Sequence, residues 1–132
     1  MNILLTECMN ILGAESAVAS ERESQQILEG VQNGFLFSAA GRLLKGAMGE
    51  CEKIDVEMAL GAFDPDERVA LFWDDARVPI VFTSLRRIRD GLFDVLAVGF
   101  YAYIYSKERG FLMELTGSGR AVVCKNKSSG GE

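Results

Sequence analysis

The chain has 132 residues, of which 48% are hydrophobic and 25% charged, so its size and composition fit one soluble globular domain. It contains no histidine, which excludes a Ser-His-Asp triad, a Cys-His pair and a His-ligated zinc site. Its net charge of −5 disfavours a nucleic-acid-binding protein, because nucleic acid requires a basic face.

The charge is distributed unevenly along the chain. Residues 1–83 hold fourteen of the nineteen carboxylates but only six of the fourteen Lys and Arg, a net charge of −8. Residues 84–132 carry a net charge of +3. A field polarised in this way steers the encounter with a charged partner.

No targeting or membrane segment is expected. The longest apolar run, residues 95–104, is about half the ~20 residues that a membrane helix needs. The first twelve residues lack a basic segment and include Glu7, unlike a signal peptide. We therefore expect a cytoplasmic protein without a membrane partner.

The N-terminal third predicts one long helix. Residues 2–12 are apolar and fit either a short helix or a first strand. Ser20 and Glu23 match a capping box, in which the Ser hydroxyl and the Glu carboxylate each accept a backbone N–H. We expect the helix to begin near Ala14 and to end at Gly34, a typical C-terminal stop.

The middle of the chain reads as strands. Residues 35–37 start one strand, and residues 53–60 alternate most clearly between apolar and charged side chains. A turn is expected around Pro65. Residues 69–73 and 78–82 follow as two further strands.

The C-terminal third predicts a short helix and three strands. Thr83 or Ser84 caps the helix, and Gly91 ends it. Residues 92–105 are mostly apolar and read as a long buried strand with a kink at Gly99. The remaining strands, expected at 111–116 and 120–124, are joined by a hairpin turn at 117–119.

The connections are short, which favours an antiparallel sheet over βαβ crossovers. The predicted fold is therefore a single compact α+β domain over residues 1–124. It has an antiparallel sheet of about five to six strands, with one longer N-terminal helix and one short helix packed on it. Residues 125–132 are small and polar, and we expect a disordered tail there.

The cysteines and carboxylates predict no cofactor. Cys8, Cys51 and Cys124 are odd in number and widely spaced, so we expect buried or inert thiols rather than a disulfide framework or a metal site. The sequence from Asp64 to Asp66 lacks the full calcium-loop pattern. No metal and no other cofactor is therefore expected.

Two further clusters have more than one interpretation. Tyr101, Tyr103 and Tyr105 alternate along one strand, and their face is either covered by the helix or a recognition surface. Arg86 and Arg89 share one face of the short helix, and Arg87 lies beside them. Such arginines hold a phosphate, form a solvated helix face, or pair with the acidic half of the chain.

The acidic groups predict a docking surface for a protein partner. The turns at 64–67 and 74–75 bound one strand and should lie at its opposite ends, flanking an acidic strand face. The candidate contacts are these carboxylates with one aromatic anchor: Asp55, Glu57, Asp64, Asp66, Trp73, Asp74 and Asp75.

These observations favour a non-catalytic acidic binding protein that docks on and neutralises a basic protein partner. Small acidic α+β domains of this kind fit the class of immunity proteins that block bacterial toxins. Many such toxins are nucleases, in which carboxylates can occupy a channel meant for phosphate. The comparison is one of class and rests on no family motif.

Two alternatives remain at this point. A secretion chaperone of the type III kind is usually an acidic dimer that ends in a helix, whereas this chain is expected to end in a strand. A curved-sheet domain could bind a small molecule, with Asp94 as a desolvated base if it were an enzyme. The oligomeric state is left open.

Overall fold

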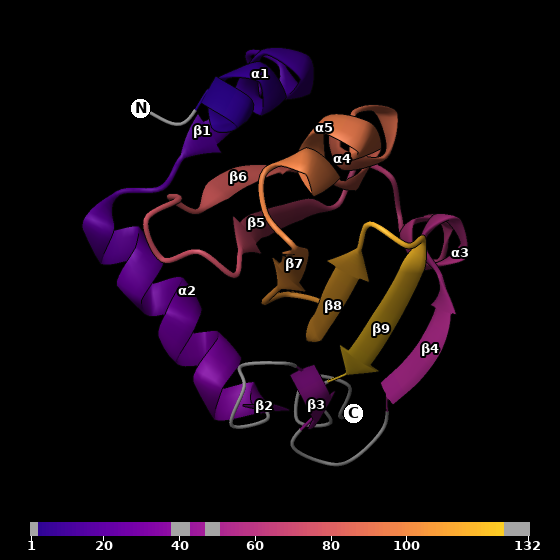
Figure 1. Cartoon of the computed structure of the whole chain (residues 1–132). Coiled ribbons are helices and arrows are strands. Elements are labelled where there is room, and N and C mark those ends of the chain that lie inside the picture. The colour runs from indigo at the N-terminus through magenta and orange to yellow at the C-terminus, as the bar shows by residue number, and fades with distance from the viewer. Residues whose placement is uncertain (1–2, 38–42, 47–50, 126–132) are drawn as a thin grey trace.

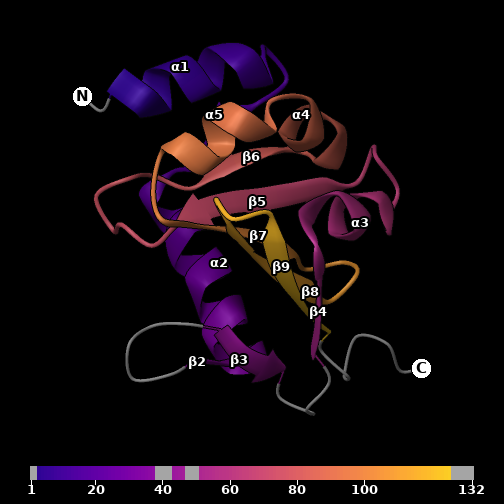
Figure 2. The same ribbon diagram turned by 45° about the vertical axis from the view of Figure 1, so that its right-hand side comes forward.

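A computed structural model describes residues 3–37, 43–46 and 51–125 (Figure 1). Seven strands form one antiparallel sheet in the order β1-β6-β5-β7-β8-β9-β4, and β2 and β3 form a separate pair. Helices pack on both faces of the large sheet (Figures 1 and 2). The predicted single α+β domain is confirmed, with a somewhat larger sheet than expected.

The elements have the following bounds. The helices are α1 (Ile3–Leu12), α2 (Glu21–Gly34), α3 (Val56–Gly61), α4 (Leu85–Asp90) and α5 (Leu92–Ala97). The strands are β1 (Ala17–Val18), β2 (Phe35–Phe37), β3 (Leu43–Gly46), β4 (Cys51–Asp55), β5 (Arg68–Trp73), β6 (Val81–Ser84), β7 (Tyr101–Ser106), β8 (Phe111–Thr116) and β9 (Arg120–Lys125).

Helix α2 begins at its capping box. The Ser20 hydroxyl accepts the Glu23 backbone N–H, and the Glu23 carboxylate accepts the Ser20 N–H. The predicted box is confirmed, but the helix begins at Glu21 and not near Ala14, because Ala17 and Val18 form strand β1, which pairs with β6 at the edge of the sheet. Gly30 lets α2 approach the sheet closely, since a Cβ there would lie 2.6 Å from the Tyr105 hydroxyl.

The apolar segment at the N-terminus is a helix. Leu5, Cys8 and Leu12 are buried at spacings of three and four residues, as expected for one face of a helix. This face packs on α4 and α5. The choice between helix and strand that the sequence left open is thereby settled.

The predicted long strand at 92–105 is wrong. Residues Leu92–Ala97 form α5, and only Tyr101–Ser106 form a strand, β7. A continuous apolar run has no clear period, so its sequence cannot distinguish a buried strand from a helix. Gly99 lies between the two elements and ends the helical part.

The alternating segment 53–60 is also only half a strand. Strand β4 ends at Asp55, and Val56–Gly61 form α3. Val56, Ala59 and Leu60 are buried, which is a helical spacing, whereas Met58 is 62% exposed. The short segment fits both the two-residue period of a strand and the 3.6-residue period of a helix. Its second half forms a helix because it covers the end of the sheet.

The two faces of the sheet bury separate cores. Leu71, Trp73 and Ile104 pack with α1, α3, α4 and α5 on one face. Tyr103 and Tyr105 point to the other face, which α2 covers. Tyr103 and Tyr105 are therefore core residues, 3% and 7% exposed, rather than a recognition surface. Burial raises the pKa of the Tyr105 phenol above its usual value.

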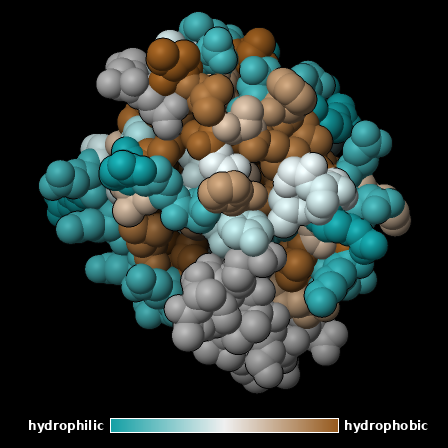
Figure 3. All heavy atoms as spheres, in the orientation of Figure 1, coloured by the Kyte–Doolittle hydropathy of each residue, from teal (hydrophilic) through white to brown (hydrophobic). Residues whose placement is uncertain are grey.

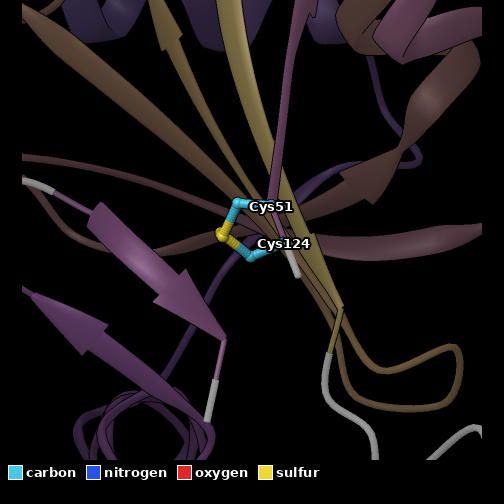
Figure 4. The surroundings of a disulfide bond; sticks show 2 residues. All are labelled: Cys51 and Cys124. Atoms are coloured by element: carbon cyan, nitrogen blue, oxygen red, sulfur yellow. A yellow bond between two sulfur atoms is a disulfide. The ribbon is translucent and has the colours of Figure 1, made fainter. Parts of the chain in front are cut away.

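A disulfide joins Cys51 and Cys124 across β4 and β9 (Figure 4). The two residues are directly opposed in register, and their Cα atoms are 4.1 Å apart. The expectation of three free thiols is wrong for this pair, because 73 residues of sequence separation conceal the strand pairing that brings them together. Cys8 is the free, buried thiol.

The C-terminal tail lies largely outside the described residues. Lys125 is the last residue of β9, and the predicted disorder concerns residues that the structure does not describe. No helix in the described part of the chain is long and apolar enough to cross a membrane.

Candidate functional site

The described residues contain no group of three or more acidic or cysteine side chains placed to hold a metal ion. The hollows found on this part of the molecule are open, and three of them have volumes of about 580–650 Å³. The exposed surface is therefore the candidate functional region.

The acidic residues at the two ends of β5 lie as the sequence predicts. Asp64 and Asp66 precede the strand, and Asp74 and Asp75 follow it. Six residues of extended chain separate the two pairs by roughly 20 Å. Figure 2 shows α3 and the connection after β5 on opposite sides of the molecule.

Asp55 and Glu57 lie on the α3 side. Both are exposed at the junction of β4 and α3, and neither side chain has a partner in the described part of the chain. We call Asp55, Glu57, Asp64 and Asp66 the α3 group, because they flank this helix. The sheet does not bring the α3 group and the Asp74–Asp75 pair into one patch.

Asp66 is held by an arginine. Its carboxylate forms an ion pair with Arg86 at 3.0 Å, while the Asp64 carboxylate accepts the Asp66 backbone N–H. Arg87 pairs with Glu15 at 3.3 Å. The predicted internal pairing is therefore confirmed for Arg86 and Arg87, and a hollow of about 650 Å³ opens beside these pairs.

The Asp74–Asp75 pair is fixed by its neighbours. The Asp74 carboxylate accepts the Tyr101 N–H at 3.2 Å. Asp75 accepts two guanidinium hydrogen bonds from Arg77, each 3.0 Å long. These bonds hold the pKa of Asp75 below its usual range, so the carboxylate is ionised at neutral pH.

Trp73 is not on this surface. Its side chain is buried, with 4% exposed, and its indole Nε1 donates to the Val95 carbonyl at 2.9 Å. The prediction of Trp73 as an aromatic anchor is wrong, because Trp73 faces the helix-covered core. The most exposed aromatic residues in the described part of the chain are Phe93 and Phe100, each 85% exposed.

Phe93 and Phe100 belong to an apolar surface on α5 and the residues after it. We call Phe93, Leu96, Ala97 and Phe100 the aromatic surface; the first three lie on one side of α5, and Phe100 follows the helix just before β7. Ile3 and Leu4 of α1 are also exposed, and α1 packs against α5. Figure 3 shows apolar side chains gathered over this region.

The sequence reading missed the aromatic surface. If residues 92–105 were a strand, Phe93 and Phe100 would have fallen on its alternate faces and drawn no attention. A helical period over 92–97 would have separated buried Val95 from exposed Phe93. The helical period of residues 92–97 was therefore the sequence signal that could have predicted an exposed Phe93.

A comparison with protein families identifies the chain. The family model described as CdiI immunity protein EcoliA0-like matches residues 2–123. The chain belongs to this family. No curated protein matches it. As an immunity protein it neutralises a toxin, and neither the secretion-chaperone nor the small-molecule alternative is favoured.

The free thiol of Cys8 does not resemble an activated nucleophile in this immunity protein. Asp94 lies on α5 near the buried thiol of Cys8. Burial, and then the negative charge of Asp94, raise the pKa of Cys8 to about 11. The thiol is therefore protonated at neutral pH and a poor nucleophile.

Proposed function

We propose that this immunity protein neutralises a basic toxin by docking on it directly in the cytoplasm, without catalysing a reaction. The net charge of −8 in residues 1–83 is the observation that carries the proposal. A strongly acidic surface attracts a basic protein and repels nucleic acid. If the toxin is a nuclease, carboxylates would occupy the surface on which its phosphate substrate lies.

The proposed contacts are the exposed carboxylates of the α3 group and of the Asp74–Asp75 pair. Asp55 and Glu57 form no ion pair within the described residues, and Arg120 lies opposite Asp55 across the β4–β9 pairing. A standard interface covers about 800 Å² on each partner. Both groups can steer the toxin through their long-range field, whichever of them the contact area covers.

Charge-neutralised variants test this proposal. Asp74→Asn with Asp75→Asn removes two charges and keeps an acceptor for the Tyr101 N–H. Asp55→Asn with Glu57→Gln removes two charges from the α3 group. The control is Glu21→Gln with Glu29→Gln, which changes the charge equally on α2, on the opposite face of the sheet.

The measurement is the association rate with the purified, inactivated domain of the toxin that this protein neutralises, at low and moderate salt. We expect at least one acidic pair to slow association about threefold to tenfold at low salt and to weaken its salt dependence. The α2 control should change the rate less. Association that is independent of salt and equal in all variants would refute the electrostatic mechanism.

A further inference from the structure

The aromatic surface is unusual because two large apolar side chains face solvent without a partner element. Phe93 and Phe100 are each 85% exposed, more than any other large apolar side chain of the described residues, of which Ile3 at 74% and Met58 at 62% come next. Phe93, Leu96, Ala97 and Phe100 follow a spacing of three, four and seven residues. Phe93, Leu96 and Ala97 share one side of α5, and Leu96, Ala97 and Phe100 line one hollow, so the four residues form one apolar strip.

Neighbouring contacts fix Phe100 in place. Gly99 packs so closely on the end of β5 that a Cβ there would lie 2.9 Å from Asp74 Oδ1. On the other side of Phe100, Tyr101 forms two hydrogen bonds with Asp74, each 3.2 Å long. Its carbonyl accepts the Asp74 N–H, and its own N–H donates to the Asp74 carboxylate. These contacts restrain the backbone that carries Phe100, which lowers the entropy cost of ordering this segment against a partner.

The same contacts place Phe100 beside acidic side chains. Asp74, Asp75 and the segment from Leu96 to Phe100 line one open hollow of about 580 Å³. The charged side chains that line this hollow are both carboxylates, Asp74 and Asp75. The apolar strip therefore has an acidic border.

We propose that the aromatic surface is the anchor of the toxin interface. Phe93 and Phe100 enter an apolar pocket of the toxin, and Lys or Arg side chains at the edge of that pocket meet Asp74 and Asp75. This inference rests on the proposed function and locates its contact area on the α5 side rather than at α3.

A second copy of this chain fits the surface less well than a basic toxin does. A two-fold contact places the same patch on both partners, so each acidic border would face another acidic border. Like charges opposed in an interface cost free energy. A toxin with basic residues around an apolar pocket complements both the strip and its border.

The test compares serine variants of the anchors with a matched control. Phe93→Ser and Phe100→Ser remove the exposed rings, and Met58→Ser removes a 62% exposed apolar side chain on α3. Circular dichroism and the fluorescence of buried Trp73 establish that each variant is folded. The affinity of each for the inactivated toxin domain is then measured by calorimetry.

We expect each Phe variant to bind about 30-fold more weakly, which is the effect of a hot-spot residue. The double variant should fail to protect cells that express the active toxin, whereas Met58→Ser should protect them and bind as the parent does. The toxin affinity of Asp74→Asn with Asp75→Asn should also fall, more at low salt than at high salt.

The outcomes separate the two proposals. If the parent protein does not bind the toxin domain, the proposed function fails. If the parent binds and both Phe variants bind equally well, only the aromatic anchor is overturned. A dimer of the parent that Phe100→Ser converts to monomer, with unchanged toxin affinity, would assign the surface to a second copy and overturn the anchor too.

Discussion

The ion pair between Glu67 and Arg109 provides a quantitative test of the packing around β5. The Glu67 side chain is 7% exposed and accepts hydrogen bonds from Arg109 Nε at 3.1 Å and from Ser106 Oγ at 3.0 Å. These contacts fix the β7–β8 hairpin to the start of β5. Arg109→Gln removes the cation and leaves the Ser106 hydroxyl as a side-chain donor to a buried carboxylate.

The expected cost follows from the exposure of the two partners. Exposed ion pairs contribute about 0.2–1 kcal/mol, and breaking a fully buried pair costs about 3–5 kcal/mol. Arg109 is 62% exposed while its carboxylate is buried, so the cost lies between these limits. We expect Arg109→Gln to lower the free energy of unfolding by about 1–2 kcal/mol.

The matched control is Arg86→Gln. The Arg86–Asp66 pair has a similar length, 3.0 Å, but its side chains are 48% and 76% exposed. Its loss should cost no more than about 0.5 kcal/mol. Urea unfolding followed by the fluorescence of Trp73, the single tryptophan, measures both variants. Equal costs for the two substitutions would refute the argument from burial.

Three further predictions concern other parts of the fold. Reducing the Cys51–Cys124 disulfide should lower the free energy of unfolding by roughly 4 kcal/mol, because it closes a loop of 73 residues; thiol titration of the unfolded protein should find one thiol before reduction and three after it. The pKa of Cys8 is raised, so its thiolate is disfavoured in the folded state. The free energy of unfolding should therefore fall as pH rises from about 9 to about 11, and Cys8→Ala should remove this dependence. Trp73→Phe should lower the free energy of unfolding by about 1–3 kcal/mol, because it removes the buried bond to the Val95 carbonyl and leaves a small cavity.

Controls for these predictions come from the same structure. Cys51→Ser with Cys124→Ser should match the reduced protein and be insensitive to reductant. For Cys8, parent and Cys8→Ala proteins that lose stability in parallel above pH 9 would show that other groups cause the change. A Trp73→Phe protein as stable as the parent by circular dichroism would mean that the indole bond contributes nothing.

The sequence alone determined the features that depend on neighbouring residues. The capping box at Ser20 and Glu23, the cap at Ser84 and the hairpin at 117–119 form as predicted, because each satisfies backbone groups within a few positions. The α+β class also followed from the pattern of short segments. The acidic pairs at the two ends of β5 followed from chain order alone.

Tertiary structure decided what depends on distant residues. Residues 56–61 and 92–97 are helices because there they cover a sheet whose strands come from elsewhere in the chain. Cys51 meets Cys124 only through the β4–β9 pairing. The sheet buries Trp73 and leaves Phe93 and Phe100 exposed. Hydrophobicity gives the tendency of a side chain to be buried, but only packing determines which apolar residues remain outside for a partner.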